Sequence, residues 1–430
     1  MSVDRNLFMY NLSVAAIMKN EGPYIKEWLD YNLLAGVEHF YIYDNDSPDN
    51  MKEVLQPYIE KKVVTYIFYP GIARQYEAYI DAVNNFRFES RYIAFIDGDE
   101  FIFPQNNKSI GEVLDEIFEK FPEVGGLGIN WHIFGSSFLE TANYSIGVME
   151  RFTMRADDSD IPISEKNGYP TKNAHIKTIA DPRKIDYFYN PHFAKYFRGC
   201  NAINENGNRV KIFFNNPPTV SKIVINHYWQ KSREEYQNKV KRGAADSKGN
   251  VYANGEFAHS CNEVFDDSIL DYCEYRKKSI LHGQEILEVL PFETESERIR
   301  RVMDTLLDNF SSANIEKITS NISTLDVETL LTWRAVSERF NINFGGQYLE
   351  EFILKLIITR FANYNNIDFH NGQQFLKAVP ELSIRPFEVA KDVKNLAIQI
   401  LPMMTNAFKM IGEWKNFEKF DYVMRLLKTL

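Results

Sequence analysis

The chain contains 430 residues, 44% of them hydrophobic, which predicts a folded protein with a substantial core and about two domains. Its formal net charge of -10 argues against nucleic-acid binding, because that function needs a basic surface to neutralise phosphates. The three cysteines, Cys200, Cys261 and Cys273, are odd in number and lack CxxC spacing, so neither a disulfide framework nor a structural zinc site is indicated.

The N-terminal residues 1–22 contain no long apolar run, which predicts the approach to a first strand and not a signal peptide. No stretch reaches the roughly 18 apolar residues that a membrane span requires. We therefore expect a cytoplasmic protein in a reducing compartment. A peripheral contact with the inner face of the membrane stays open.

Short β-rich runs alternate with helical patterns through the first hundred or so residues. We predict strands at 13–18, 39–43, 63–69 and 92–96, and helices at 24–35, 51–60 and 74–88. Pro23 and Gly36 flank the first helix, which is ordinary helix punctuation. This alternation predicts an α/β domain, in which helices cover a mainly parallel sheet and the ligand lies at the carboxyl ends of the strands.

Beyond this region we expect one more strand at 125–131 and a long polar surface loop at 156–173, which is typical of a lid or binding loop. After Tyr272 the pattern becomes helical, at 296–309, 315–321, 327–340, 347–361, 390–401 and 416–427. The sequence thus predicts two domains, an α/β domain at 1–288 and an all-helical C-terminal domain at 289–430.

The motif Asp97-Gly98-Asp99 follows the buried run of the fourth predicted strand. Two carboxylates that flank a glycine can turn toward one oxygen-liking cation, Mg²⁺ or Mn²⁺, which can bridge to a diphosphate. An Asp-x-Asp alone is weak evidence, since acidic turns are common. Its place at a strand end favours a metal site.

Other polar residues follow the remaining strands or face the same edge. Asp44 and Asn45 lie in a turn suited to a nucleobase or ribose, although that turn also suits the cap of the next helix. Lys19 and Glu21 end the first strand. Gln75 and Tyr79 are four residues apart on one helical face, which either looks into a nucleotide pocket or packs on the sheet.

Several separate motifs, in one order, carry a family resemblance. They are Lys19-Asn20-Glu21 with Glu27-Trp28, Gly36 to Ser47, Ile96 to Phe101, Trp131 to Ser137, His175 to Ile179, Asn226-His227-Tyr228 and Lys231-Ser232. Over residues 13 to 275 the chain resembles glycosyltransferase family 92 and, more widely, family 2 enzymes with a GT-A fold.

The resemblance implies a UDP-sugar donor and a divalent metal, Mn²⁺ or Mg²⁺. Asp97 and Asp99 then contact the donor and metal, Gly98 lies against the donor, and His227 is the third metal ligand. Without the family, a histidine after an apolar run is more often structural. Lys231 and Arg242 are alternative cations for the leaving diphosphate, and Lys231 is preferred because it is nearer His227, although the helical stretch between them also suits solvent.

Candidate residues for contact with the sugar or the acceptor lie at and just after the end of the predicted strand 125–131. Trp131, Phe134 and Ser136 are candidates for contact with a sugar, because aromatic faces suit sugar C–H surfaces, but the two aromatic residues also suit the core. An inverting transferase needs a carboxylate base. Glu150 is the first choice, with further candidates at Glu100, Asp157, Asp158, Asp160 and Glu165.

The resemblance implies transfer of a hexose, with galactose expected because it occurs among relatives, from a UDP-sugar to a saccharide acceptor in surface glycan synthesis. The alternatives are a nucleotidyltransferase, which would need a phosphate loop that Lys19 to Pro23 match poorly, and a sugar-binding scaffold with a helical interaction module. The C-terminal segment 408–430 leaves self-association and membrane contact open.

Overall fold

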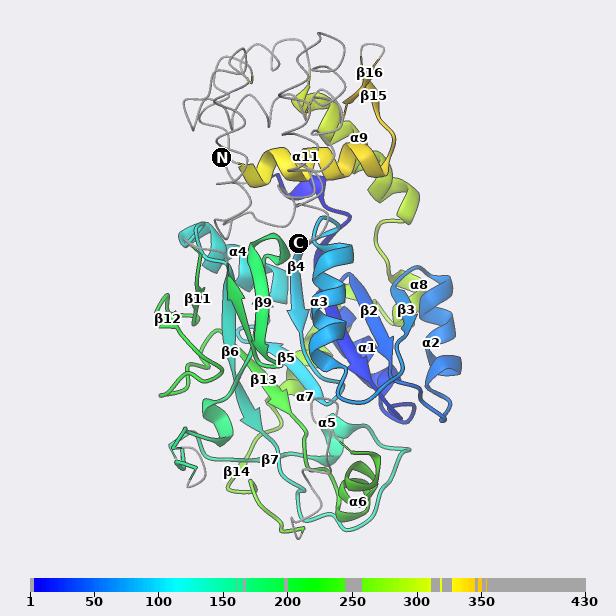
Figure 1. Cartoon of the computed structure of the whole chain (residues 1–430). Coiled ribbons are helices and arrows are strands. Elements are labelled where there is room, and N and C mark those ends of the chain that lie inside the picture. The colour runs from blue at the N-terminus through cyan, green and yellow to red at the C-terminus, as the bar shows by residue number, and fades with distance from the viewer. Residues whose placement is uncertain are drawn as a thin grey trace. The chain divides into compact units, whose positions relative to one another are not determined.

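The computed structural model describes residues 4–159, 161–164, 168–196, 200–243, 257–310, 318, 327–344, 347–349 and 353 (Figure 1). The chain divides into two compact units. The sheet unit consists of Phe8–Tyr196 and Cys200–Arg298, and the C-terminal unit consists of Met1–Leu7, Phe197–Gly199 and Ile299–Leu430.

The sheet unit is built on four parallel strands in the order β3-β2-β1-β4. These strands are β1 (Tyr10–Met18), β2 (His39–Asp44), β3 (Val64–Phe68) and β4 (Ser90–Phe95). Their register sets Met18 beside Asp44 and Ala15 beside Phe95. Their carboxyl ends therefore meet at one edge, to which β2 and β4 point in Figure 1.

The sheet continues beyond β4 with mixed direction. β8 (Ile176–Ala180) runs antiparallel between β4 and β6 (Gly126–Ile133). β13 (Ile223–His227) pairs in parallel with the end of β6 and antiparallel with β5 (Glu100–Pro104). At the far side lie β11 (Ala202–Ile203) and β12 (Arg209–Val210). The segment after β4 and the end of β13 thus reach the same part of the sheet.

Alternate residues of β1 face two different layers, as the strand period of two requires. Leu12, Val14 and Ala16 belong to one core cluster with residues of α1 (Ile25–Leu34), α2 (Met51–Glu60) and α4 (Ile110–Lys120). Ala15 and Ile17 belong to another with α3 (Gln75–Phe86) and the hairpin β9 (Ile185–Asn190) and β10 (Phe193–Tyr196). Helices therefore cover both faces, so the predicted α/β fold class is confirmed.

The predicted strands and helices of the first hundred residues agree with β1 to β4 and α1 to α3 within a few residues at each end. The sequence prediction passed over β5 and α4. α4 nevertheless has a clear start signal, the reciprocal capping box of Ser109 and Glu112. In the predicted surface loop at 156–173, the terminal Ala156 and Asn173 are buried, so its ends belong to the core.

The remaining described elements of the sheet unit are short or peripheral. They are α5 (Val148–Arg151), β7 (Met154–Arg155), η2 (Lys172–Ala174), η3 (Pro182–Lys184), α6 (Arg233–Arg242), β14 (Val264–Phe265), α7 (Ser268–Ile280), α8 (Ile286–Val289) and the start of α9 (Glu295–Asn309). Of these, α6 matters most for the site, because it follows β13 directly.

In the C-terminal unit, the described residues form η1 (Arg5–Leu7), the rest of α9, α11 (Val327–Arg339) and a pair of short strands, β15 (Asn343–Phe344) and β16 (Gln347–Tyr348). The helices predicted at 296–309 and 327–340 are confirmed. The helix predicted to begin at 347 is wrong at its start, where β16 lies. The helices at 390–401 and 416–427 and the segment 408–430 lie outside the described residues, as does nearly all of 315–321. Among the helices that the structure describes, none has the length and apolar character for crossing a membrane.

A buried ion pair attaches α6 to the sheet unit. The guanidinium group of Arg151 donates from Nη1 to Glu235 Oε2 and from Nη2 to Glu235 Oε1, each at 2.9 Å. The two side chains are only 5% and 1% exposed. Glu235 also closes the capping box with Ser232 at the start of α6. The position of α6 therefore depends on one fully paired internal carboxylate.

Replacing Arg151 with methionine should lower the free energy of unfolding by about 3–5 kcal/mol, because the Glu235 charge stays buried without its main partner. Urea denaturation of the full chain measures this loss. Lys278→Met is the matched control, since Lys278 and Glu274 form a pair on α7 with side chains 79% and 72% exposed, and its removal should change stability by less than about 0.5 kcal/mol. Equal losses in the two variants would contradict the importance of the buried pair.

Candidate active site

The turns that follow β1 and β2 are joined by hydrogen bonds. The backbone amide of Asn20 donates to Ser47 Oγ at 3.0 Å, and that of Gly22 donates to Asp49 Oδ2 at 2.8 Å. Asn20 has a φ of 56°, in the left-handed region that asparagine tolerates better than most residues. The edge of the sheet is thus a connected surface and not a set of independent loops.

Asp44 and Asn45 support this edge from inside. The Asp44 carboxylate accepts from the Tyr66 hydroxyl at 2.7 Å and from the Ser47 amide at 3.0 Å. The Asn45 side-chain amide donates to the backbone carbonyls of Tyr69 and Gly71. Both side chains therefore shape the turns, and their contact with a nucleotide stays a prediction.

Asp97 lies in a closed network behind the edge. Gln75 Nε2 donates to Asp97 Oδ1 at 2.6 Å, and the Tyr79 hydroxyl donates to the same oxygen at 3.2 Å. The ammonium of Lys177, from β8, lies 2.9 Å from Asp97 Oδ2 and 3.5 Å from Glu100 Oε2. The predicted shared face of Gln75 and Tyr79 exists, and it turns toward Asp97.

Burial decides the charges in this network. Lys177 and Glu100 are completely buried. Burial lowers the pKa of Lys177, but the carboxylates of Asp97 and Glu100 outweigh it and raise the pKa above its usual value, so the lysine stays charged. Burial and the two neighbouring aspartates raise the pKa of Glu100 well above normal, despite the opposing effect of Lys177. Lys177 is therefore a permanent internal cation for these acids.

Asp99 faces a different set of partners. Its Oδ1 lies 3.4 Å from His227 Nε2, at the end of β13, and its Oδ2 lies 2.7 Å from Lys239 Nζ, on α6. Burial raises the pKa of Asp99, yet Lys239 and His227 outweigh burial and hold it well below its usual value. Burial lowers the pKa of His227 more than Asp99 raises it, so the imidazole is neutral near pH 7.

Gly98, between Asp97 and Asp99, packs against the end of β1. A Cβ atom at Gly98 would lie 3.2 Å from Met18 Cε and 3.4 Å from Glu21 Cγ, so a larger residue would press on both side chains. The motif thus packs directly against the first strand. Contact of Gly98 with a donor stays a prediction.

A divalent cation fits the pair of Asp99 and His227 as part of its coordination sphere. Two neighbouring ligands of an octahedral cation, each about 2.1 Å from it, lie about 3 Å apart, which is close to the 3.4 Å between Asp99 Oδ1 and His227 Nε2. The ionised carboxylate and the neutral imidazole are the forms that bind metal. Within the described ranges no three His, Cys, Asp or Glu side chains gather closely enough to hold a metal. Further ligands would have to come from a bound molecule or water, and phosphate substrates commonly supply them.

The structure therefore brings together two of the three predicted metal ligands. Asp97 has its own partners, Lys177, Gln75 and Tyr79, and its role as a ligand stays a prediction.

Trp131 borders the same site from β6. Its ring centroid lies 4.4 Å from that of His227 and 5.1 Å from those of His175 and His192. The residue is 7% exposed, and its Nε1 has no hydrogen-bond partner in the part of the chain that the structure describes. Trp131 thus lies beside the predicted metal ligand His227, and its contact with a sugar stays a prediction.

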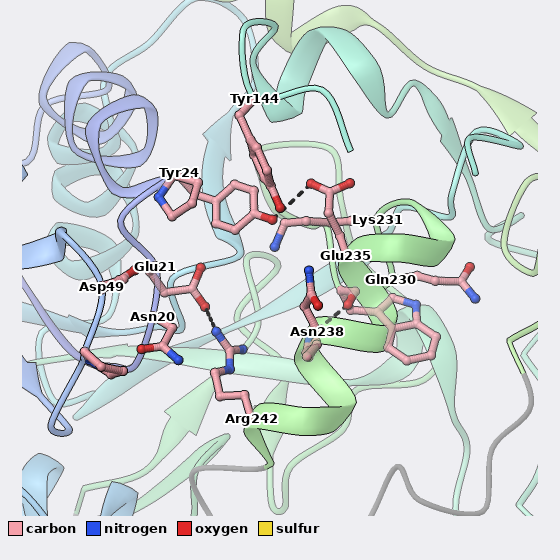
Figure 2. A pocket seen from close by; sticks show the side chains of 14 residues that line it. Asn20, Glu21, Tyr24, Asp49, Tyr144, Gln230, Lys231, Glu235, Asn238 and Arg242 are labelled. Atoms are coloured by element: carbon pink, nitrogen blue, oxygen red, sulfur yellow. Dashed lines mark hydrogen bonds and ion pairs between the residues drawn. The ribbon is translucent and has the colours of Figure 1, made fainter. Parts of the chain in front are cut away.

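A cavity of about 360 Å³ opens between the end of β1, the turn after β2 and α6 (Figure 2). Arg242 Nη1 bonds the Glu21 carboxylate and donates to the Lys19 carbonyl at 2.8 Å. Lys231 lies with its Nζ 4.4 Å from the centre of the Tyr24 ring. Figure 2 shows Arg242 facing Glu21 across the cavity, with Lys231 beside Tyr24. Three cations, Lys231, Lys239 and Arg242, line the cavity together with three carboxylates, Glu21, Asp49 and Glu235, so an anionic ligand would bind on the side of the cations.

Of the other predicted residues, Phe134 and Ser136 are buried and Glu150 is exposed. Phe134 is completely buried against Tyr228, which is the core position that the sequence also allowed, and its contact with a sugar stays a prediction. Ser136 is also buried, and its hydroxyl hydrogen-bonds His259 Nδ1 at 2.6 Å. Glu150 is exposed on α5, while its neighbour Arg151 is buried. Its role as the base stays a prediction.

Sequence reasoning missed Lys177 and Lys239. Lys177 stands inside the motif His175 to Ile179, but its role requires β8 to lie beside β4, a pairing that no local pattern reveals. Lys239 and Arg242 are three residues apart on α6 and share one helical face, so their spacing was a usable signal.

The family follows from comparison with known proteins. A family model described as glycosyltransferase family 92 matches residues 13–252, more than half of the chain. The fold is that of an α/β protein whose polar edge contains the family's predicted motifs. The chain belongs to glycosyltransferase family 92.

Similar curated proteins come from plants. A family 92 protein of Oryza sativa subsp. japonica is 30% identical over 129 residues, which cover 30% of this chain and 22% of the relative. One of Ricinus communis is 23% identical over 236 residues, covering 54% of this chain and 38% of the relative. Among solved structures, S. aureus TarS 1-349 in complex with UDP-GlcNAc is 13% identical and covers 81% of this chain and 84% of that one, with a TM-score of 0.29.

The histidines around Trp131 should make stability depend on pH. Burial and the nearby Lys177 hold the pKa of His192 well below 6.5 in the folded protein, whereas the unfolded chain takes up a proton at about pH 6.5. The unfolded state then binds more protons, so the free energy of unfolding falls as pH decreases below about 6.5 and is fully retained above it.

His192→Asn should reduce this pH dependence by up to about 1.4 kcal/mol per pH unit, the contribution of one proton. Urea denaturation at several pH values between about 7.5 and 5.5 measures the slope. His282→Asn serves as the control, because His282 is exposed. Identical slopes for wild type and His192→Asn would show that His192 gains a proton in the folded state as easily as in the unfolded state.

Proposed function

We propose that the chain is a metal-dependent, inverting glycosyltransferase that transfers a hexose from a UDP-sugar to a saccharide acceptor. The observation that carries the proposal is the ionised Asp99 opposite the neutral His227, next to a cation-lined cavity at the carboxyl ends of β1 and β2. This arrangement occurs in a chain that belongs to glycosyltransferase family 92.

The cavity supports binding of a nucleotide diphosphate. Lys231, Lys239 and Arg242 place three cations at its wall, and a diphosphate is the part of the donor that needs them. The turns after β1 and β2 are joined, so the nucleotide end of the donor would meet a preformed surface. Doubly wound sheets bind nucleotides at this edge.

Asp99 and His227 would hold the divalent cation, together with oxygens of the donor's diphosphate. When bound, such a cation neutralises the charge that develops on the leaving diphosphate. Lys231 would add a cation on the cavity side. Its pKa is lowered, first by burial, with Lys239 and Arg242 acting in the same direction and Glu21 and Asp99 opposing.

The aromatic surface of Trp131 supports a place for the hexose beside His227. Sugar rings present C–H faces that pack on aromatic rings, and a buried Nε1 can donate to a sugar hydroxyl. The identity of the hexose, inversion at its anomeric carbon and the base Glu150 rest on the sequence alone. A cytoplasmic location and a surface glycan as product also stay predictions.

Asp99→Asn should abolish metal-dependent donor binding and leave the fold intact, because the amide keeps the shape of the side chain and loses the ligating charge. In the presence of Mn²⁺ we expect the affinity for UDP to fall by about 100-fold or more, because loss of a mere outer-shell partner already costs a metal site about 10–100-fold. Isothermal titration calorimetry with UDP, with and without Mn²⁺, measures this. Asp271→Asn is the control, since Asp271 is exposed on α7. Unchanged UDP affinity in Asp99→Asn would rule out the assigned role.

The reaction itself is tested by release of UDP from a panel of UDP-sugars, with and without Mn²⁺ and with saccharide acceptors. We expect metal-dependent release with at least one donor. Release of pyrophosphate from a sugar phosphate and UTP would favour a nucleotidyltransferase. Binding of sugars without turnover of any donor would favour a non-catalytic scaffold.

A further inference from the structure

Lys239 forms an ion pair with Asp99, the carboxylate that would bind the proposed metal. Its Nζ lies 2.7 Å from Asp99 Oδ2 and 2.8 Å from the Trp229 carbonyl oxygen, to which it donates. The lysine and aspartate side chains are 15% and 9% exposed, so this is a shielded ion pair and not a surface contact. The proposed metal position on Asp99 thus already has a monovalent cation beside it.

An ammonium group and a divalent cation on the same carboxylate repel each other, most strongly where water is excluded. Binding of the metal to Asp99 therefore favours departure of Lys239. A lysine can make this move because its charge ends a flexible four-carbon stem. Asp97 has a different cation, Lys177, together with Gln75 and Tyr79, so the exchange concerns Asp99 alone.

The ammonium group of Lys239, once displaced from Asp99, can bind a diphosphate in the neighbouring cavity. Lys239 lines the cavity together with Lys231 and Arg242, so a diphosphate bound there lies within its surroundings. Arg242, one turn further along α6, stays fixed on Glu21 and on the carbonyl of Lys19. Lys239 can therefore change partners while the helix itself remains attached.

We propose that Lys239 holds the place of the metal on Asp99 while no metal is bound, and that metal binding releases its ammonium for the donor's diphosphate. The inference rests on the proposed function and adds a coupling between the two ligands. Metal binding makes Lys239 available for the donor, and by thermodynamic linkage the donor equally favours metal binding.

Lys239→Met removes the charge and keeps most of the length of the side chain. In the full chain without donor, Mn²⁺ should bind about tenfold more tightly, because a charge-assisted competitor for Asp99 is lost. At saturating Mn²⁺, UDP should bind about tenfold more weakly, because one cation for the diphosphate is lost. Electron paramagnetic resonance of free Mn²⁺ and calorimetry with UDP measure the two constants.

The matched control is Lys241→Met, since Lys241 lies on the same helix and is exposed. It should leave both affinities unchanged. If Lys239 is purely structural, Lys239→Met should bind Mn²⁺ more weakly than wild type. If Lys239 never leaves Asp99 and replaces the metal permanently, wild type should not bind Mn²⁺ at all. Mn²⁺ affinity that is equal to or below that of wild type in Lys239→Met overturns the inference.

A second measurement needs no variant. Trace acetylation of the wild-type protein, followed by mass spectrometry, reports the reactivity of each lysine, with Lys241 as internal reference. We expect Mn²⁺ alone to raise the reactivity of Lys239 and added UDP to lower it again. Unchanged reactivity with bound Mn²⁺ overturns the exchange while the proposed function stands. Absence of Mn²⁺ binding in both wild type and Lys239→Met overturns the metal part of the proposed function as well.

Discussion

The cost of burying negative charge determines how this site is built. Asp97, Asp99 and Glu100 follow β4 within four residues, with Asp99 and Glu100 buried and Asp97 partly buried, and buried acids are tolerated only when they are paired or neutral. Their partners come from distant parts of the chain, Lys177 from β8 and Lys239 from α6. The sheet must therefore place β8 beside β4, and α6 must return over the edge after β13.

The sequence predicted the first four strands and three helices because each shows a local period and ordinary punctuation. The pairing of Asp99 with His227 was also predictable, but only through the family motifs, since the two residues are far apart in sequence. Lys177 could not be assigned in this way. A lysine in an apolar strand gives no sign that it will be fully buried between two carboxylates, because that depends on which strand lies beside it. The sequence left Phe134 open between the core and a sugar contact for a related reason, since its packing on Tyr228 depends on the pairing of β6 with β13.

The two aspartates of the motif have different electrostatic surroundings, although they are only two residues apart. Asp97 meets a lysine that is completely buried and belongs to the sheet, so its partner is part of the fold. Asp99 meets a lysine on a helix at the rim of a cavity and an imidazole that carries no charge near pH 7. A fixed cation suits a structural carboxylate, whereas a movable one suits a carboxylate that binds ligands. The glycine between them allows this division, because the motif turns tightly against the end of β1.

α6 has to satisfy two opposing demands. Lys239 must be able to change partners when a ligand binds, yet the helix must stay in place for Lys239 to reach the ligand. The buried pair of Arg151 and Glu235 meets the second demand at the start of the helix, and the contact of Arg242 with Glu21 meets it at the end. Lys239 lies between these two attachments, where one side chain can move without moving the backbone. The ion pair that fixes α6 thus belongs to the chemistry of the site as much as to the stability of the fold.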